Sequence, residues 1–270
     1  MPTPESCLVL RKAGNDQLIV TADFAATGRT AATFHDLVER LSVDCNIWEI
    51  APLPYGTEPG KTGSDQVNRW VKDIRDSGMV VHAVIGFCAG NAYAAAMAGQ
   101  IAGWQQAPRL VLLDPGIPKP VMLVEHIQGW LRRFSAGFPA EEAERAGARL
   151  DAIAEAGDHP LVMAAQLGEF FGQAVAPGLI RAGHSQQAAT GFTKLVTGYL
   201  YWLAGAIQFD PRPQWRTAPA LNSNSPGFGL FLAPPEERPT LVGSARYFDV
   251  AHFDLMRTKD VAAAVDQLLS

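Results

Sequence analysis

The sequence is poor in cysteine and contains no long hydrophobic run. Its three cysteines, Cys7, Cys45 and Cys88, cannot all pair, and none has C-x-x-C spacing. This pattern argues against a disulfide-stapled scaffold and predicts free thiols in a reducing compartment. No stretch of about 18 uncharged apolar residues is present, which argues against a transmembrane helix. The first ten residues lack the basic and apolar regions of a signal peptide, so we expect a cytoplasmic protein.

Charged residues are also scarce, and they form no cluster of one sign. They make up 18% of the chain, the net charge is −5, and no more than two Lys or Arg residues are adjacent. This distribution lacks the basic patch of a nucleic-acid-binding protein. No group of His, Cys, Asp and Glu has the spacing of a zinc site, so we expect no metal. The 48% of hydrophobic residues is typical of a globular protein with a sizeable core.

One stretch is similar to a phosphate-binding loop but has the wrong spacing. The sequence YGTEPGKTGSD at residues 55–65 contains Gly-Lys-Thr and leads into a helical pattern. A P-loop needs four residues between its first glycine and this triplet, whereas only three separate Gly56 from Gly60. We therefore interpret residues 55–65 as a polar loop and not as a nucleotide site.

Strand-like and helix-like segments alternate through the first 115 residues. Helical spacing of apolar residues predicts helices over residues 30–42 and 64–78. The run MVVHAVIGF at residues 79–87 is apolar almost throughout, which is typical of a strand buried on both faces of a parallel sheet. Similar apolar runs predict further strands over residues 6–11, 17–23, 45–53 and 109–114.

The character of the sequence changes in its second half. Residues 120–210 are rich in Ala, Leu and Gly with a helical pattern, and strand signals return at residues 218–224 and 240–250. This order predicts an α/β fold with a mostly parallel sheet, helices on both faces and a helical lid insertion. We expect residues 1–118 and 213–270 to form the two parts of the core and residues 119–212 to form the lid.

The segment GFCAG, Gly86 to Gly90, joins the predicted strand at residues 79–87 to a helical stretch. Strand, G-x-nucleophile-x-G and helix together form a nucleophile elbow, a sharp turn that lifts one side chain clear of the sheet. Small residues at both ends avoid clashes there, and the start of the helix favours the thiolate of Cys88. Alternatively, Cys88 is a buried cysteine that fits a glycine turn. The flanking strand and helix favour the catalytic interpretation.

A cysteine nucleophile needs a base, and the base needs an acid that orients it. Hydrolases with this elbow place the acid and then the histidine after the nucleophile. Only His252 lies after the last predicted strand and before the final helix. The loop after residues 109–114 begins at Asp114, whereas the loop at residues 222–227 contains no carboxylate. We therefore predict that Cys88, Asp114 and His252 are catalytic, although Asp114 before Pro-Gly also fits an ordinary turn.

An acyl-transfer site also needs backbone N–H donors for the oxyanion and a channel for the substrate. We expect one donor from Ala89 and a second from Phe24 or Ala25, in the loop that follows the strand at residues 17–23. The lid contains several aromatic residues at helical spacing, and most of these are expected to pack inward. We predict Phe192 and Trp202 as channel wall.

Three motifs resemble those of one family of enzymes. IGFCAGNAYAAAMA, RLVLLDPGIP and VAHFDLMR are similar to the nucleophile, acid and histidine motifs of thioesterase-like α/β hydrolases, which release products from polyketide and non-ribosomal peptide synthases. The resemblance covers nearly the whole chain and implies an α/β-hydrolase fold. It also implies an acyl or peptidyl carrier protein as partner, with the substrate on its phosphopantetheine arm and no other cofactor. The chain departs from the family pattern in its cysteine and in Ala25-Ala26, where Gly-Gly is usual.

A free-standing chain of this length with Cys88, Asp114 and His252 most resembles the Dieckmann cyclases, which form tetramate or pyridone rings. That resemblance implies intramolecular carbon–carbon bond formation on a β-ketoamide aminoacyl thioester. An acyl group on Cys88 stays a thioester, whose carbonyl a carbon nucleophile can attack if water is excluded. Two alternatives remain at this point: a hydrolytic thioesterase with the same three residues, and a non-catalytic binding protein.

Overall fold

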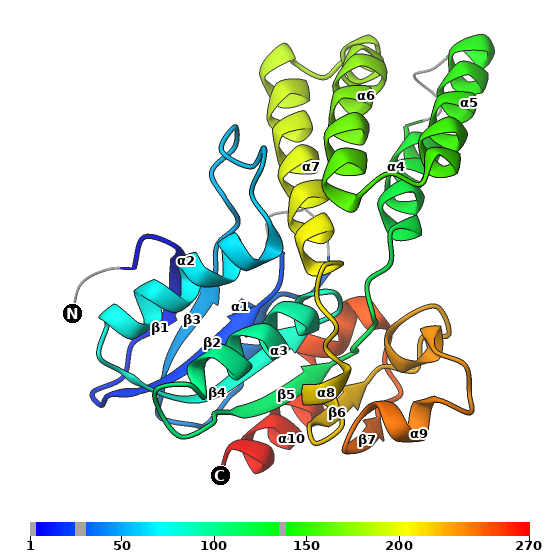
Figure 1. Ribbon diagram of the computed structural model, residues 1–270. Coiled ribbons are helices and arrows are strands. Elements are labelled where there is room, and N and C mark those ends of the chain that lie inside the picture. Colours follow the sequence, from blue (N-terminus) through cyan, green and yellow to red (C-terminus); the bar gives the residue numbers. More distant parts are fainter. Residues whose placement is uncertain (1–3, 25–30, 135–138) are drawn as a thin grey trace. The chain divides into compact units, whose positions relative to one another are not determined.

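The computed structural model describes residues 4–24, 31–134 and 139–270, and the chain divides into two compact units (Figure 1). One unit comprises Met1–Ala51, Ser64–Ile117 and Phe209–Ser270, and the other comprises Pro52–Gly63 and Pro118–Gln208. The first is called the sheet unit below and the second the helical unit. The sequence prediction placed residues 52–63 in the core, whereas these residues group with the helices.

The sheet unit is built on seven strands in the order β1-β3-β2-β4-β5-β6-β7. Only β1 is antiparallel to its neighbour, and the other pairings are parallel. The predicted parallel sheet is therefore confirmed. The strands are β1 (Cys7–Arg11), β2 (Gln17–Ala22), β3 (Asn46–Ile50), β4 (Val80–Phe87), β5 (Arg109–Leu113), β6 (Pro219–Asn222) and β7 (Ser244–Tyr247).

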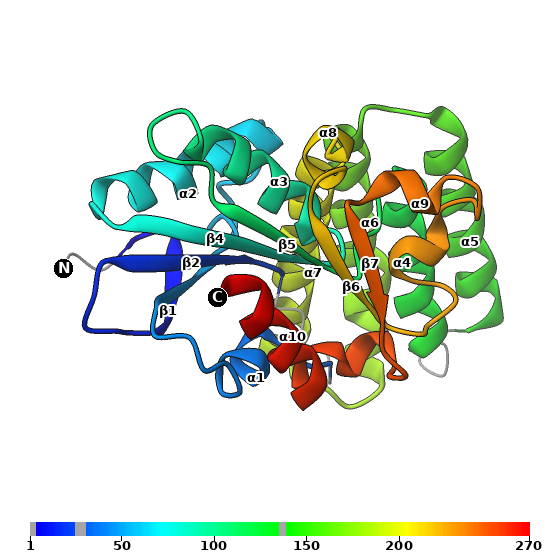
Figure 2. The same ribbon diagram turned by 90° about the horizontal axis from the view of Figure 1, so that it is seen from below.

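Helices cover both faces of this sheet (Figure 2). On one face lie α2 (Gly63–Asp76), α3 (Gly90–Ile101) and α8 (Arg212–Trp215), and on the other lie α1 (Phe34–Val38) and α10 (Lys259–Leu269). Phe34 and Val261 of the second pair pack with Ile85 of β4 in one apolar cluster. Burial of such side chains drives the layers together.

Two predicted elements are shorter in the structure. The helix predicted over residues 30–42 is only α1, and the Arg11 guanidinium binds the carbonyl oxygens of Val38 and Leu41, which lie at and beyond the helix end. The strand predicted over residues 240–250 is only β7, since a helical turn, α9 (Arg238–Leu241), occupies its first part. Two 3₁₀ helices complete this unit, η3 (Gly229–Leu232) and η4 (His252–Arg257).

The helical unit consists of four long helices and the loop at Pro52–Gly63. The helices are α4 (Val121–Arg133), α5 (Ala140–Ala156), α6 (Pro160–Arg181) and α7 (Gln186–Ala206). The loop contacts α7 through Lys194, which lies over the Tyr55 ring, and the Gly63 N–H donates to Oε1 of Gln208, which follows α7. No helix in the described part of the chain has both the length and the apolar character needed to cross a membrane.

Candidate active site

Cys88 occupies the sharp turn between β4 and α3, and its backbone has a φ of 51°. This left-handed conformation is costly for a residue with a Cβ. A Cβ on Gly86 would lie 2.6 Å from Cα of Asn91, and one on Gly90 would overlap the carbonyl oxygen of Ala22. Both glycines are therefore required by close backbone approach. The turn leaves Cys88 half-buried, whereas Cys7 and Cys45 are buried.

Asn91 is a member of the site that the sequence prediction missed. Its side chain is fully buried, and its Nδ2 donates to the carbonyl oxygens of Cys88 and Leu113, each at 2.9 Å. The Cys88 N–H also donates to Leu113, at 3.0 Å. These bonds tie the strained turn to the end of the neighbouring strand β5. The only signal in the sequence is an amide in the first turn of an alanine-rich helix.

Asp114 follows β5 directly and is held as tightly as the cysteine. Its φ is 44°, and its side chain is 1% exposed. The Ser223 N–H, just after β6, donates to Oδ1 at 2.7 Å, while Oδ2 accepts a hydrogen bond from Nδ1 of His252 at 2.8 Å. A Cβ on Gly229 would lie 2.7 Å from Oδ1. The carboxylate is thus fixed on both oxygens, with one aimed at the imidazole.

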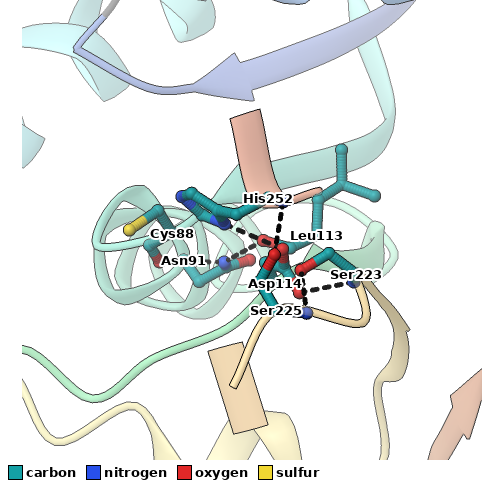
Figure 3. A network of polar contacts seen from close by, with 7 residues as sticks. All are labelled: Cys88, Asn91, Leu113, Asp114, Ser223, Ser225 and His252. Carbon is teal, nitrogen blue, oxygen red and sulfur yellow. Dashed lines mark hydrogen bonds and ion pairs between the residues drawn. The ribbon is translucent and has the colours of Figure 1, made fainter. Parts of the chain in front are cut away.

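His252 begins η4 and is 2% exposed. Its N–H donates to Oγ of Ser225 at 2.8 Å. The imidazole stacks on Phe87 and Phe228, with ring centroids 4.7 Å and 4.0 Å away. Figure 3 shows the imidazole between the Cys88 thiol and the Asp114 carboxylate. The three residues predicted from the sequence therefore lie together, at the carboxyl edge of the sheet.

The surroundings of His252 change its affinity for a proton. Burial lowers the pKa of the imidazole, but hydrogen bonds to Asp114 and Cys88 and the charges of both raise it, and the net result is a pKa of about 9. The imidazole is therefore a cation near neutral pH. This cation is hydrogen-bonded to both the Asp114 carboxylate and the Cys88 side chain.

The other two thiols have a different environment. Burial raises the pKa of Cys7 to about 12, and burial also raises the pKa of Cys45. Both side chains belong to the buried core, at 5% and 7% exposure. Thiols in such surroundings are inert. Among the three cysteines, Cys88 alone is not fully buried, and it also has a neighbouring imidazole.

The backbone N–H groups predicted as oxyanion donors differ in their hydrogen bonding. The Ala89 N–H, at the start of α3, has no hydrogen-bond partner among the described residues. The Phe24 N–H donates to Oδ1 of Asp23 at 2.7 Å, so it is occupied in this conformation. The role of Phe24 as an oxyanion donor stays a prediction. Ala25, the other candidate, lies outside the described residues.

The two predicted channel residues both lie on α7 in the helical unit. Phe192 is half-buried and contacts the rings of Trp130, Phe134 and Phe171. Trp202 is only 2% exposed. Phe192 is thus partly exposed, whereas Trp202 is buried and stacks on Tyr199. Their role as channel wall stays a prediction.

Neither a scan against protein-family models nor a search of curated proteins finds a match for the sequence. Solved structures do match the fold. The NocB thioesterase domain from the nocardicin cluster has 16% identity and a TM-score of 0.56, covering 98% of each chain. YbtT, a type II thioesterase from the yersiniabactin pathway, has 13% identity and a TM-score of 0.55, covering 98% of this chain and 96% of its own.

A third structure is the Vlm2 thioesterase domain, solved with a bound dodecadepsipeptide. It has 15% identity and a TM-score of 0.53, and 98% of each chain is covered. Together with the seven-stranded, mostly parallel sheet, these likenesses show that the chain has an α/β-hydrolase fold. At such low identities the likeness is one of fold.

Proposed function

We propose that this protein is an off-loading cyclase. It takes a β-ketoamide aminoacyl thioester from the phosphopantetheine arm of an acyl or peptidyl carrier protein and releases it by Dieckmann condensation as a tetramate-type ring. No other cofactor takes part. The observation that carries the proposal is a cysteine at φ 51°, beside an imidazole that is hydrogen-bonded at 2.8 Å to a buried carboxylate.

Acylation is the first step of the proposed reaction. The Cys88 thiolate attacks the thioester carbonyl, and the oxyanion forms beside the Ala89 N–H. The carbon–sulfur bond to the carrier breaks, and the His252 imidazolium gives its proton to the departing thiolate. The acyl group is then on Cys88, and the imidazole is neutral. Asp114 holds the ring in orientation throughout.

Acylation prepares His252 for the second step. Two contributions that raise its pKa, the hydrogen bond to Cys88 and the charge of the thiolate, disappear when the sulfur carries an acyl group. The imidazole is then a neutral base that removes a proton from the carbon between the two β-ketoamide carbonyls. Such proton transfer contributes about 10²–10⁴-fold to a rate. The carbanion attacks the Cys88 thioester carbonyl, the ring closes, and the thiolate leaves beside the imidazolium.

Sulfur suits this reaction better than oxygen. An acyl group on serine would be an oxoester, whereas on Cys88 the carbonyl keeps the reactivity of a thioester toward carbon. The second candidate, a hydrolytic thioesterase, uses the same three residues but attacks with water. The presence of cysteine where hydrolysis needs only a hydroxyl favours the cyclase.

Product analysis distinguishes the two functions. The protein is incubated with a β-ketoamide aminoacyl pantetheine thioester, and the products are separated and identified by mass. We expect the cyclic tetramate as the main product. A linear acid as the sole product would contradict the cyclase function and support the hydrolytic thioesterase. Cys88→Ala is expected to form neither product, whereas Cys45→Ala, in the core, keeps the wild-type product.

A further inference from the structure

Asp23 is a buried carboxylate at the site that the proposed reaction does not use. It follows β2 directly and is 4% exposed. Its Oδ1 accepts the Phe24 N–H at 2.7 Å. This N–H is one of the two backbone donors predicted for the second oxyanion contact, and the Asp23 carboxyl group occupies it.

The sheet places Asp23 beside the nucleophile. β2 and β4 are parallel neighbours, and Ala22 pairs with Gly86, two residues before Cys88. A Cβ on Gly90 would lie 3.3 Å from the Asp23 nitrogen, so the start of α3 reaches the end of β2. Asp23 and Asp114 therefore follow the two strands that flank β4. Asp114 binds the imidazole, and Asp23 lies on the other side of the elbow.

A substrate carbonyl can reach the Phe24 N–H only if the Asp23 carboxylate leaves it. A buried carboxylate that loses a hydrogen bond is costly, unless another donor replaces the one it gave up. A plain fatty acyl thioester brings no such donor. An aminoacyl thioester does, because its amide N–H is on the carbon next to the thioester carbonyl.

We propose that Asp23 is a specificity-determining residue that exchanges the Phe24 N–H for the amide N–H of the substrate. The exchange opens the second oxyanion contact when an N-acyl-aminoacyl thioester binds, and it keeps that contact closed to thioesters without an N–H. This inference rests on the proposed acyl transfer to Cys88, and it does not depend on whether a ring or an acid is the product.

The test compares two pantetheine thioesters that differ in one group. One carries an N-acylglycyl group, and the other carries the O-acylglycolyl group, in which oxygen replaces N–H. The readout is release of pantetheine in the first turnover, which precedes ring closure and hydrolysis alike. The variants are Asp23→Ala, Asp23→Asn and, as a matched control, Asp16→Ala, an exposed carboxylate at the other end of β2.

Wild type and Asp16→Ala are expected to release pantetheine about 10- to 100-fold faster from the N-acylglycyl thioester than from the O-acylglycolyl thioester. This ratio corresponds to the free energy of one hydrogen bond to a charged group. Asp23→Ala is expected to act on both thioesters at similar rates, because its Phe24 N–H is open. Asp23→Asn keeps an acceptor oxygen without the charge, so its preference is expected to be intermediate. If Asp23→Ala does not fold, the preference of Asp23→Asn between the two thioesters tests the inference.

Equal rates for the two thioesters in wild type would overturn the inference. A wild-type preference that is unchanged in the folded Asp23 variants would also overturn it, because the preference would then come from elsewhere. No pantetheine release from either thioester would overturn the proposed function itself. The two failures are therefore distinguishable.

Discussion

At the scale of single residues, strain and chemistry coincide. Cys88 and Asp114 are the only described residues other than glycine with a positive φ, at 51° and 44°. Such conformations persist only where the surrounding structure imposes them, and they gather at functional sites. Here the Asn91 amide and the Ser223 N–H hold the two strained residues through hydrogen bonds. The surrounding fold thus imposes the two strained conformations that place the thiol and the carboxylate next to the His252 imidazole.

The proton affinity of His252 tests this arrangement. Its pKa of about 9 depends partly on the hydrogen bond and charge of Cys88. We expect Cys88→Ala to lower the pKa, because both contributions disappear while Asp114 remains. Titration of the imidazole by NMR measures this. A pKa unchanged by Cys88→Ala would show that the thiol and the imidazole do not interact.

The three thiols are expected to react at different rates. Cys88 is half-buried and lies beside the His252 imidazolium, whereas burial raises the pKa of Cys7 to about 12 and also raises that of Cys45. With iodoacetamide near pH 7, we expect Cys88 to be labelled at least about 100-fold faster, since the thiolate is the nucleophile. Peptide mapping over time gives the three rates. Equal labelling would favour a non-catalytic binding protein.

At the scale of elements, the turn between β4 and α3 depends on its glycines. A Cβ on Gly90 would overlap the Ala22 carbonyl oxygen, which belongs to β2 and cannot move alone. We expect Gly90→Ala to lower the free energy of unfolding by about 3 kcal/mol, at the upper end of overpacking effects, and to remove activity.

Gly99 on the same helix is the matched control for Gly90. Its added Cβ would meet only the end of the Gln214 side chain, at 3.5 Å. Gly99→Ala is therefore expected to raise stability by about 0.5–1 kcal/mol, as alanine does inside helices. Denaturant unfolding of both variants measures the difference. Similar effects at the two positions would contradict the close approach of α3 to β2.

At the scale of the whole molecule, the parallel sheet brings distant parts of the sequence to one edge. The buried Asp114–His252 pair then links the sheet unit's stability to pH. Its folded pKa of about 9 lies above the ordinary 6.5, so the stabilisation is complete below pH 6.5 and is lost as pH rises through 9. The stabilisation that is lost over this pH range amounts to about 3 kcal/mol.

Urea unfolding between pH 6 and 10 measures this loss. Asp114→Asn is expected to flatten the curve, because the neutral amide does not hold a proton on His252. A wild-type curve that rises between pH 7 and 9 would contradict the raised pKa.

Much of this edge could be predicted from the sequence. Buried parallel strands have long apolar runs, so β2, β4 and β5 were evident, and with them the positions of Cys88 and Asp114. The hydrogen bond between Asp23 and Phe24 could not be predicted, because it depends on one side-chain rotamer in a loop. The grouping of residues 52–63 with the helical unit depends on long-range contacts, which local periodicity does not encode.

The central claim is that Cys88 accepts the acyl group and that carbon, not water, removes it. A thioester whose carbon between the two carbonyls carries two methyl groups has no proton for His252 to remove there. We expect this compound to acylate Cys88 and to remain, so intact-protein mass should rise by one acyl group, absent in Cys88→Ala. A wild-type protein that consumes the unblocked thioester but gains no acyl mass from the blocked one would contradict the account.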